Sequence, residues 1–237
     1  ISNNPNLPNL AHFTLKGDFD FHEKEQPQAS ANLQIEELQH NHTTYNSIQT
    51  TAEWKKGNLT FSIDSNSPHL VFSAQGSGKF NGKKLKDFYS TLQVDECNPQ
   101  KLNWSSRYPN TNFSSSLSLC INDFKGPVPY GNMEVNDFKM KRETEEEYTL
   151  HHLLLKIFPN EESSTLTLDS DFAKVNLKGD FQIQALKDYG NYLFSHYLSD
   201  TLQSANINKE KLKDWSLSAE IIKTDFVNKL LKFPLES

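Results

Sequence analysis

The feature that most constrains this chain is a pattern of alternating apolar residues that occurs twice. The stretch from Tyr45 to Phe80 and the stretch from Tyr148 to Ile183 have equal lengths and a similar succession of apolar and polar residues. Strict alternation predicts strands that are apolar on one face and polar on the other. Repetition of such a unit predicts an extended structure built by stacking, in which neither copy buries its apolar face alone.

The closing phrase of the repeat also occurs near the N-terminus. Residues 15–21 read LKGDFDF, and residues 177–183 read LKGDFQI. Hydrophobic residues make up 35% of the chain, below the roughly 45–50% (glycine included) of an average globular domain. Strands with one solvated face produce this shortage, because every second residue is polar. The chain is therefore predicted to be mainly β, with repeated antiparallel strands.

The organisation along the chain follows from breaks in the alternation. Residues 98–116 are poor in apolar residues and rich in Asn, Ser and Pro, which is typical of an irregular loop. The predicted segments are a linker at 1–12, a first β repeat at 13–97, the loop and boundary at 98–116, a second β repeat at 117–185 and a helix–strand–helix tail at 186–237.

The tail changes from a period of two to helical spacing. Residues 186–203 carry Leu and Tyr at helical intervals and predict an amphipathic helix. Trp215 to Ile221 alternates again and predicts a strand, and a short apolar helix that ends before Pro234 follows. The fold is thus expected to end in two short amphipathic helices.

Charge and composition limit the classes of partner. The net charge is −6, with acidic and basic residues interspersed. Nucleic-acid binding requires a basic stripe, and the small cluster of Lys83, Lys84 and Lys86 is better explained as a solvated turn or guarded strand edge. We therefore expect no nucleic-acid partner.

The two cysteines, Cys97 and Cys120, leave two alternatives open. They form a disulfide if strands bring them close together in an oxidising compartment, or they remain two thiols in strands. No apolar run in the sequence is long enough for a transmembrane helix. Because the chain begins at Ile1 without methionine, we expect it to be a piece of a longer protein.

No residue pattern predicts catalysis. Two histidine pairs, His40 with His42 and His151 with His152, lack the further ligands that zinc requires. Asp18 and the acidic residue two positions later could share a strand face, but the other copy of the phrase has glutamine at the second position. We therefore expect no enzyme, no cofactor and no metal site.

The second half of the chain resembles a known family. The phrases at 131–138, at Tyr148, at 166–170 and at 172–181, followed by the predicted amphipathic helix, resemble the TamB (translocation and assembly module) family of the AsmA-like class. The similarity is greatest to its Bacteroidota members. The first half looks like a more divergent copy of the same repeat.

This resemblance implies a large, non-enzymatic protein of the periplasm and cell envelope, anchored in the inner membrane by an N-terminal helix. Its β repeats would form a long curved sheet, folded like a taco, with an apolar groove inside. For the strands of this chain we expect such a curved, groove-like sheet or an open sandwich. The implied function is phospholipid transport between the inner and outer membranes, assembly of outer-membrane proteins, or both. The implied partners are phospholipid acyl chains, outer-membrane assembly proteins and adjacent repeats of the same parent chain.

The residues expected to line such a groove share one property, an apolar side chain on the inward phase of a predicted strand. The alternative is a structural or adhesion module, a closed β-sandwich of a secreted or cell-envelope protein in which the same side chains form a dry core. The groove candidates are Leu33, Ile35, Leu59, Phe61, Ile63, Leu92, Val94, Leu117, Leu119, Ile121, Leu166, Leu168, Val175, Leu177, Phe181 and Ile183.

Overall fold

The computed structural model contains twelve β-strands and, among the residues it describes, no helix. It describes residues 9–20, 28–40, 42–82, 84–106, 108–122, 130–142, 147–159, 163–179 and 216–223. The strands are β1 (Asn9–Asp20), β2 (Gln28–His40), β3 (Thr43–Lys55), β4 (Asn58–Ser67), β5 (Leu70–Asn81), β6 (Lys84–Cys97), β7 (Thr111–Asn122), β8 (Tyr130–Arg142), β9 (Tyr148–Pro159), β10 (Ser164–Ser170), β11 (Ala173–Gly179) and β12 (Ser216–Ile221).

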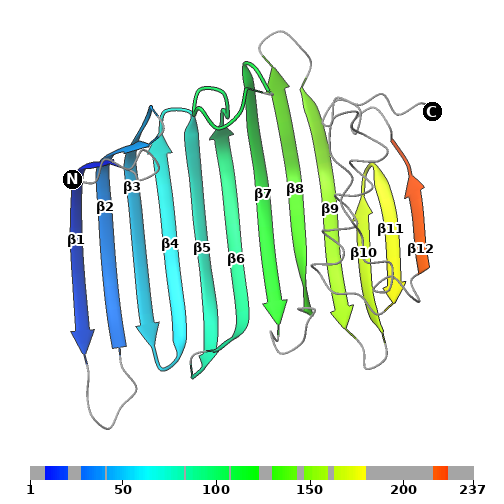
Figure 1. Ribbon diagram of the computed structural model, residues 1–237, viewed down its shortest axis with the longest axis horizontal. Coiled ribbons are helices and arrows are strands. Elements are labelled where there is room, and N and C mark those ends of the chain that lie inside the picture. The colour runs from blue at the N-terminus through cyan, green and yellow to red at the C-terminus, as the bar shows by residue number, and fades with distance from the viewer. Residues whose placement is uncertain are drawn as a thin grey trace, which may run out of the picture. The chain divides into compact units, whose positions relative to one another are not determined.

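The strands form one sheet whose spatial order equals their order in the chain, from β1 to β12 (Figure 1). This confirms the prediction of a mainly β, antiparallel fold. β1 and β12 stand at the two ends of the order, so the ladder does not close on itself. Neighbouring strands are consecutive in sequence, as expected when short turns join antiparallel strands.

The chain divides into two compact units that we describe separately. The first holds residues 1–120 and 135–151, and therefore includes β1 to β6. The second holds residues 121–134 and 152–237, and therefore includes β10 to β12. The division passes through β7, β8 and β9 partway along their length, so it does not coincide with a loop in the sequence.

The two sequence copies fold into the same succession of strands. Tyr45 lies in β3, and the stretch from Tyr45 to Phe80 covers β3, β4 and β5. Tyr148 begins β9, and the described part of the second stretch covers β9, β10 and β11. A tight turn joins β3 to β4, with Lys56 and Gly57 at φ of 50° and 76°. Left-handed backbone of this kind favours glycine and polar residues.

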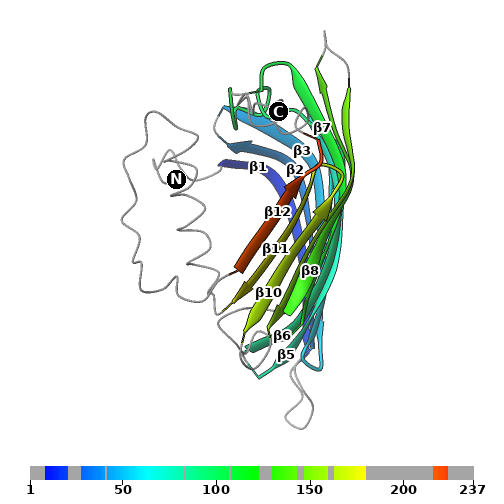
Figure 2. The same cartoon turned by 90° about the vertical axis from the view of Figure 1, so that its right-hand side faces the viewer.

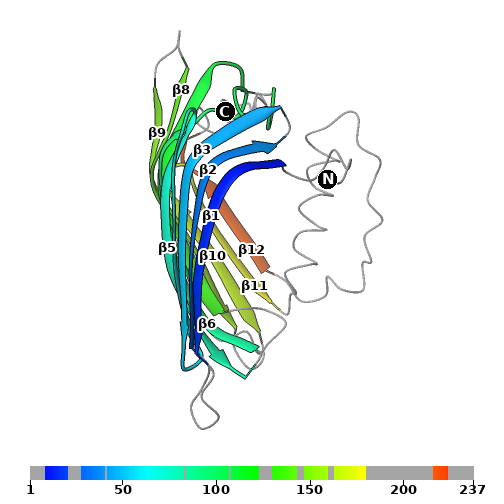
Figure 3. The same cartoon turned by 90° about the vertical axis from the view of Figure 1, so that its left-hand side faces the viewer.

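Several strands of the first unit are irregular near one end. The pairing of β1 with β2 shifts register around His12, and Ser47 in β3 has a φ of 55°. Such irregularities bend a strand and increase its twist. Figure 3 shows β1 bending near its N-terminal end, where the register shifts.

The loop of residues 98–110 packs onto the N-terminal end of β3. Leu102 is fully buried, and its carbonyl oxygen accepts a hydrogen bond from Thr43 Oγ1 at 2.9 Å. Trp104 Nε1 donates to Tyr45 Oη at 2.8 Å, and Asn103 Nδ2 donates to Thr43 Oγ1 at 3.0 Å. The sequence predicted an irregular loop and boundary over residues 98–116. In the structure only its first part covers a strand end, because residues 111–116 already belong to β7. β1 likewise begins at Asn9, inside the segment predicted as a linker at 1–12.

Polar side chains complete the same end of the first unit. Ser67 Oγ hydrogen-bonds both the backbone nitrogen and the carbonyl oxygen of Asn46. Ser65 Oγ donates to the carbonyl oxygen of Leu70 at 2.9 Å. Both serines are buried, and buried hydroxyls require such partners. This strand end is therefore more completely buried than the middle of β3 and β4, whose residues are half-buried or exposed.

The second unit contains β10, β11 and β12, which lie side by side in Figure 2. The predicted strand near the C-terminus is confirmed by β12, which pairs with β11. The turn from β10 to β11 is fixed by Ser170 Oγ, which donates to the carbonyl oxygen of Ala173 and accepts from its backbone nitrogen. Both predicted C-terminal helices lie outside the described residues.

Cys97 and Cys120 are not joined by a disulfide. Burial, and then the nearby Glu96 carboxylate, raise the pKa of the Cys97 thiol. Nothing helical in the described part of the chain has the length and apolarity that crossing a membrane requires.

Candidate functional site

The register of the first unit places the apolar residues of neighbouring strands opposite one another. Residues paired across an antiparallel ladder share a face of the sheet. Four such rows cross the strands, and each contains at most one polar residue. The rows are Ile35–Ile48–Ser65–Phe72–Val94, Leu33–Thr50–Ile63–Ala74–Leu92, Ala31–Ala52–Phe61–Gly76–Ser90 and Ala29–Trp54–Leu59–Gly78–Phe88.

We call these four rows the apolar face of the first unit. It contains every groove candidate predicted for β2 to β6, so the structure brings these residues together on one surface. Their side chains are half-buried rather than buried, which leaves part of each accessible. The candidates in this set are Leu33, Ile35, Leu59, Phe61, Ile63, Leu92 and Val94.

Glycines allow aromatic rings to lie flat on this face. A Cβ at Gly76 would lie 2.6 Å from Phe61 Cζ and 2.7 Å from the Tyr89 carbonyl oxygen, so only glycine fits there. The Phe61 ring also stacks with Phe88, with their centroids 6.2 Å apart. Gly76 therefore marks a close approach of a ring and the backbone.

The opposite face of the same strands is polar. The three central rows of this second set carry amides, hydroxyls and charges, with Tyr89 as the single aromatic residue. The rows are Gln34–Gln49–Asp64–Ser73–Gln93, Asn32–Thr51–Ser62–Gln75–Thr91 and Ser30–Glu53–Thr60–Ser77–Tyr89.

The second unit repeats this division between faces. Leu166 pairs with Ile157 and Leu177, and Leu177 pairs with Leu217. In the next row of this face, Leu155, Leu168, Val175 and Ala219 are paired in the same way. The groove candidates Leu166, Leu168, Val175 and Leu177 thus share one face, on which Leu177 is buried and the other three are half-buried.

The remaining groove candidates are not among the paired rows described above. Leu117, Leu119 and Ile121 lie on β7 and are half-buried. Phe181 and Ile183 lie outside the described residues.

The sequence prediction missed several residues of the apolar face, including Ile48, Trp54, Phe72 and Phe88. The signal was present in the sequence, since Ile48 and Trp54 are in phase within one alternating stretch. Alternation alone, however, does not say which residues of different strands lie side by side. That requires the register, which depends on turns and bulges.

The outermost strands expose their apolar residues most. Leu15 on β1 is 63% exposed, and Leu217 and Ile221 on β12 are 60% and 57% exposed. Each of these strands has a single neighbour in the order of the sheet.

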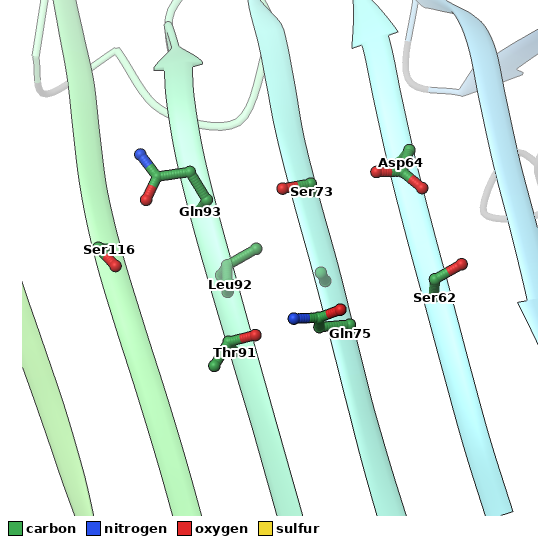
Figure 4. Close-up of a pocket in the computed structure, with 9 residues that line it drawn as sticks. Ser62, Asp64, Ser73, Gln75, Thr91, Leu92, Gln93 and Ser116 are labelled. Carbon is green, nitrogen blue, oxygen red and sulfur yellow. The ribbon is translucent and has the colours of Figure 1, made fainter.

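A hollow on the polar face was not predicted from the sequence. It measures about 440 Å³ and lies across β4, β5, β6 and β7. Figure 4 shows Ser62, Asp64, Ser73, Gln75, Thr91 and Gln93 on the viewer's side of the strands, whereas Leu92 lies behind. The hollow therefore belongs to the polar face, opposite the apolar rows.

Asp64 is the one acidic or basic side chain among the residues that line the hollow. His69 Nδ1 lies 3.6 Å from Glu96 Oε1, and both side chains are partly exposed. Within the described ranges, no three residues among His, Cys, Asp and Glu are close enough to hold a metal ion. What the apolar face offers chemically is contact area for an apolar ligand.

In comparisons with known proteins, no family model, no curated protein and no solved structure matches the chain.

Proposed function

We propose that this chain is a segment of a non-enzymatic, periplasm-spanning protein of the TamB kind, whose apolar face carries phospholipid acyl chains between the inner and outer membranes. In this proposal the sheet curves around the apolar face as a groove, and the parent chain is anchored in the inner membrane. Outer-membrane assembly proteins and adjacent repeats of the same parent chain are the proposed partners.

The observation that carries the proposal is the half-buried state of the apolar rows. Ile35, Phe61 and Leu92 keep accessible surface on one face of one sheet. Contiguous apolar surface in water marks an interaction site. Each methylene group that is transferred onto such a surface gains about 0.8 kcal/mol when fully buried. A row of apolar side chains therefore suits a long acyl chain and needs no nucleophile or base.

The division between faces supports the same ligand class. A phospholipid has an apolar tail and a polar headgroup, and the first unit has an apolar face opposite a polar one. The lateral rows cross the strands, so an extended tail could follow neighbouring strands without meeting the polar side chains. This geometry also lets several tails occupy the same face in succession.

The alternative of a closed sandwich module has less support. A sandwich packs two sheets face to face and buries the residues between them. The described strands belong to one ladder order, and the apolar rows of its first unit are half-buried. No observation specifically favours an adhesion role.

Native mass spectrometry of the purified chain tests the proposal. We expect added mass that matches phospholipid, and we expect the delipidated protein to take up a phospholipid with a fluorescent acyl chain. Trp54 lies on the apolar face and provides an internal reporter, because an acyl chain beside it should shift its emission to shorter wavelength. Delipidated, folded protein that takes up no phospholipid would rule out the proposed function.

A further inference from the structure

We propose that the hollow on the polar face binds an uncharged oligosaccharide, independently of any lipid on the apolar face. The hollow lies within the first unit, and its volume of about 440 Å³ falls in the range of about 300–1,000 Å³ that is typical of small-molecule sites. Most such sites are lined by apolar side chains. The lining of this hollow is mainly polar, which indicates a polar ligand.

Six of the nine residues that line the hollow carry a hydroxyl or amide group, which both donates and accepts hydrogen bonds. Hydroxyls come from β4, β5, β6 and β7, amides from β5 and β6, and one carboxylate from β4. Hydroxyl and amide side chains combine donor and acceptor capacity in a small space. The polar side chains of the lining are Ser62, Asp64, Ser73, Gln75, Thr91, Gln93 and Ser116.

Most of these side chains have no hydrogen-bond partner within the described protein. Ser62 Oγ shares a hydrogen bond with Thr51 Oγ1, and Gln93 Nε2 donates to Asp95 Oδ1 at 3.1 Å, which leaves the Gln93 amide oxygen available. The other five polar side chains form no hydrogen bond with described residues. They are Asp64, Ser73, Gln75, Thr91 and Ser116.

Other ligand classes fit this lining poorly. An acyl chain would leave the hydroxyls and amides unsatisfied. A phosphate or nucleic acid needs Lys or Arg, whereas the described lining has neither and includes the Asp64 carboxylate. Ca²⁺ takes about six to eight oxygen ligands, and the lining offers a single carboxylate, that of Asp64. A sugar presents many hydroxyls that donate and accept, and the lining matches that pattern.

Tyr89 supplies the second element of a sugar site. It lies on β6 two residues before Thr91, on the same face, and its side chain is 48% exposed. An exposed aromatic ring offers a flat apolar surface with a polar hydroxyl at its rim. The C–H face of a sugar ring can stack on such a surface while its hydroxyls reach Thr91 and Gln75. Extension from the hollow towards Tyr89 favours an oligosaccharide over a single sugar.

Isothermal titration calorimetry with two neutral probes, maltohexaose and the hexamer of N-acetylglucosamine, tests this inference. The hexamer of galacturonic acid serves as the anionic comparison. We expect at least one neutral probe to bind and the anionic one to bind more weakly. Gln75→Ala and Thr91→Ala should each weaken binding about fivefold, because each removes a hydrogen-bonding group.

Gln34→Ala is the matched control, since Gln34 is exposed on the same face but does not line the hollow. It should leave sugar affinity unchanged. Failure of both neutral probes to bind at millimolar concentration would overturn the inference, as would tighter binding of the anionic probe. Equal losses from Gln75→Ala and Gln34→Ala would also overturn it. Phospholipid uptake should be the same in all these variants, so the two proposals can fail separately.

Discussion

Two regions of the first unit differ in how far they bury their apolar side chains. At the N-terminal end of β3, the loop 98–110 buries Leu102 completely and satisfies Thr43 and Tyr45 with hydrogen bonds. Along the middle of the strands, residues such as Phe61 and Leu92 remain half-buried. The chain therefore seals its strand end with its own loop and leaves the broad apolar face accessible. Under the proposed function, this accessible face is the part of the unit that an acyl chain would contact.

The largest expected effect comes from a charge on the apolar face. Phe61→Asp should lower phospholipid binding at least about tenfold, because a carboxylate in contact with an acyl chain is desolvated without a partner. Leu168→Asp should do the same on the second unit. Uptake of the fluorescent phospholipid measures both effects, with circular dichroism to confirm folding.

Matched controls place the same charge on the opposite face. Ser77 is exposed and pairs with Thr60 and Tyr89, and Thr167 pairs with Lys156 and Asn176. Ser77→Asp and Thr167→Asp should leave lipid uptake nearly unchanged. If the parent protein that carries Phe61→Asp or Leu168→Asp still supports outer-membrane integrity, that strand does not line the lipid path.

The next effect concerns the sealed end. Leu102→Ala should lower the free energy of unfolding by about 2–3 kcal/mol, because it leaves a cavity at a fully buried position. Trp104→Phe removes the hydrogen bond to Tyr45 and should cost about 1 kcal/mol. Urea denaturation measures both. If Leu102→Ala does not change the midpoint, the loop is not part of the stable core.

A related effect tests the packing of rings on glycine. Gly76→Ala should destabilise the first unit by about 1–3 kcal/mol, since its Cβ would overlap Phe61 and the Tyr89 carbonyl. Ser77→Ala, at the exposed neighbouring position, is the control and should be nearly neutral. Thermal unfolding of the two variants distinguishes them. A stable Gly76→Ala protein would contradict the register described for β4 and β5.

The smallest effect concerns Cys97. Its pKa is raised, first by burial and then by Glu96, so at a given pH less reactive thiolate forms than in a free thiol. Alkylation by iodoacetamide should be slower than for glutathione, and Glu96→Gln should accelerate it modestly. The pKa of Cys97 is higher in the folded protein than in the unfolded chain. The contribution of this thiol to the free energy of unfolding is therefore fully present below the ordinary thiol pKa, and it is lost as the pH rises through the folded pKa. Alkylation as fast as that of glutathione would contradict this assignment.

The sequence was sufficient to predict strands with clear alternation, such as β4, but it placed residues 111–116 of β7 in a loop. The alternation of Leu59, Phe61 and Ile63 placed β4, and the Lys56–Gly57 pair placed the turn before it. The period of two makes such predictions robust, because a shift by one residue would move every side chain to the other face.

Other features depend on contacts between residues that are distant in sequence. The loop 98–110 reads as irregular, and its contact with Thr43 spans 59 residues. The polar hollow is equally hidden, because Ser62, Gln75 and Thr91 come from three strands and meet only through the register. The composition does not indicate the hollow either, since Ser, Thr and Gln occur throughout the solvated faces.

The exposed apolar residues of β1 and β12 have a consequence for anything that joins the sheet. A strand that pairs with β12 meets Leu217 and Ile221 on one side and polar residues on the other. If its own alternation is out of step by one position, its apolar side chains point to the polar side. A strand added at this edge would therefore continue the apolar side only if its own two-residue alternation is in phase with that of β12.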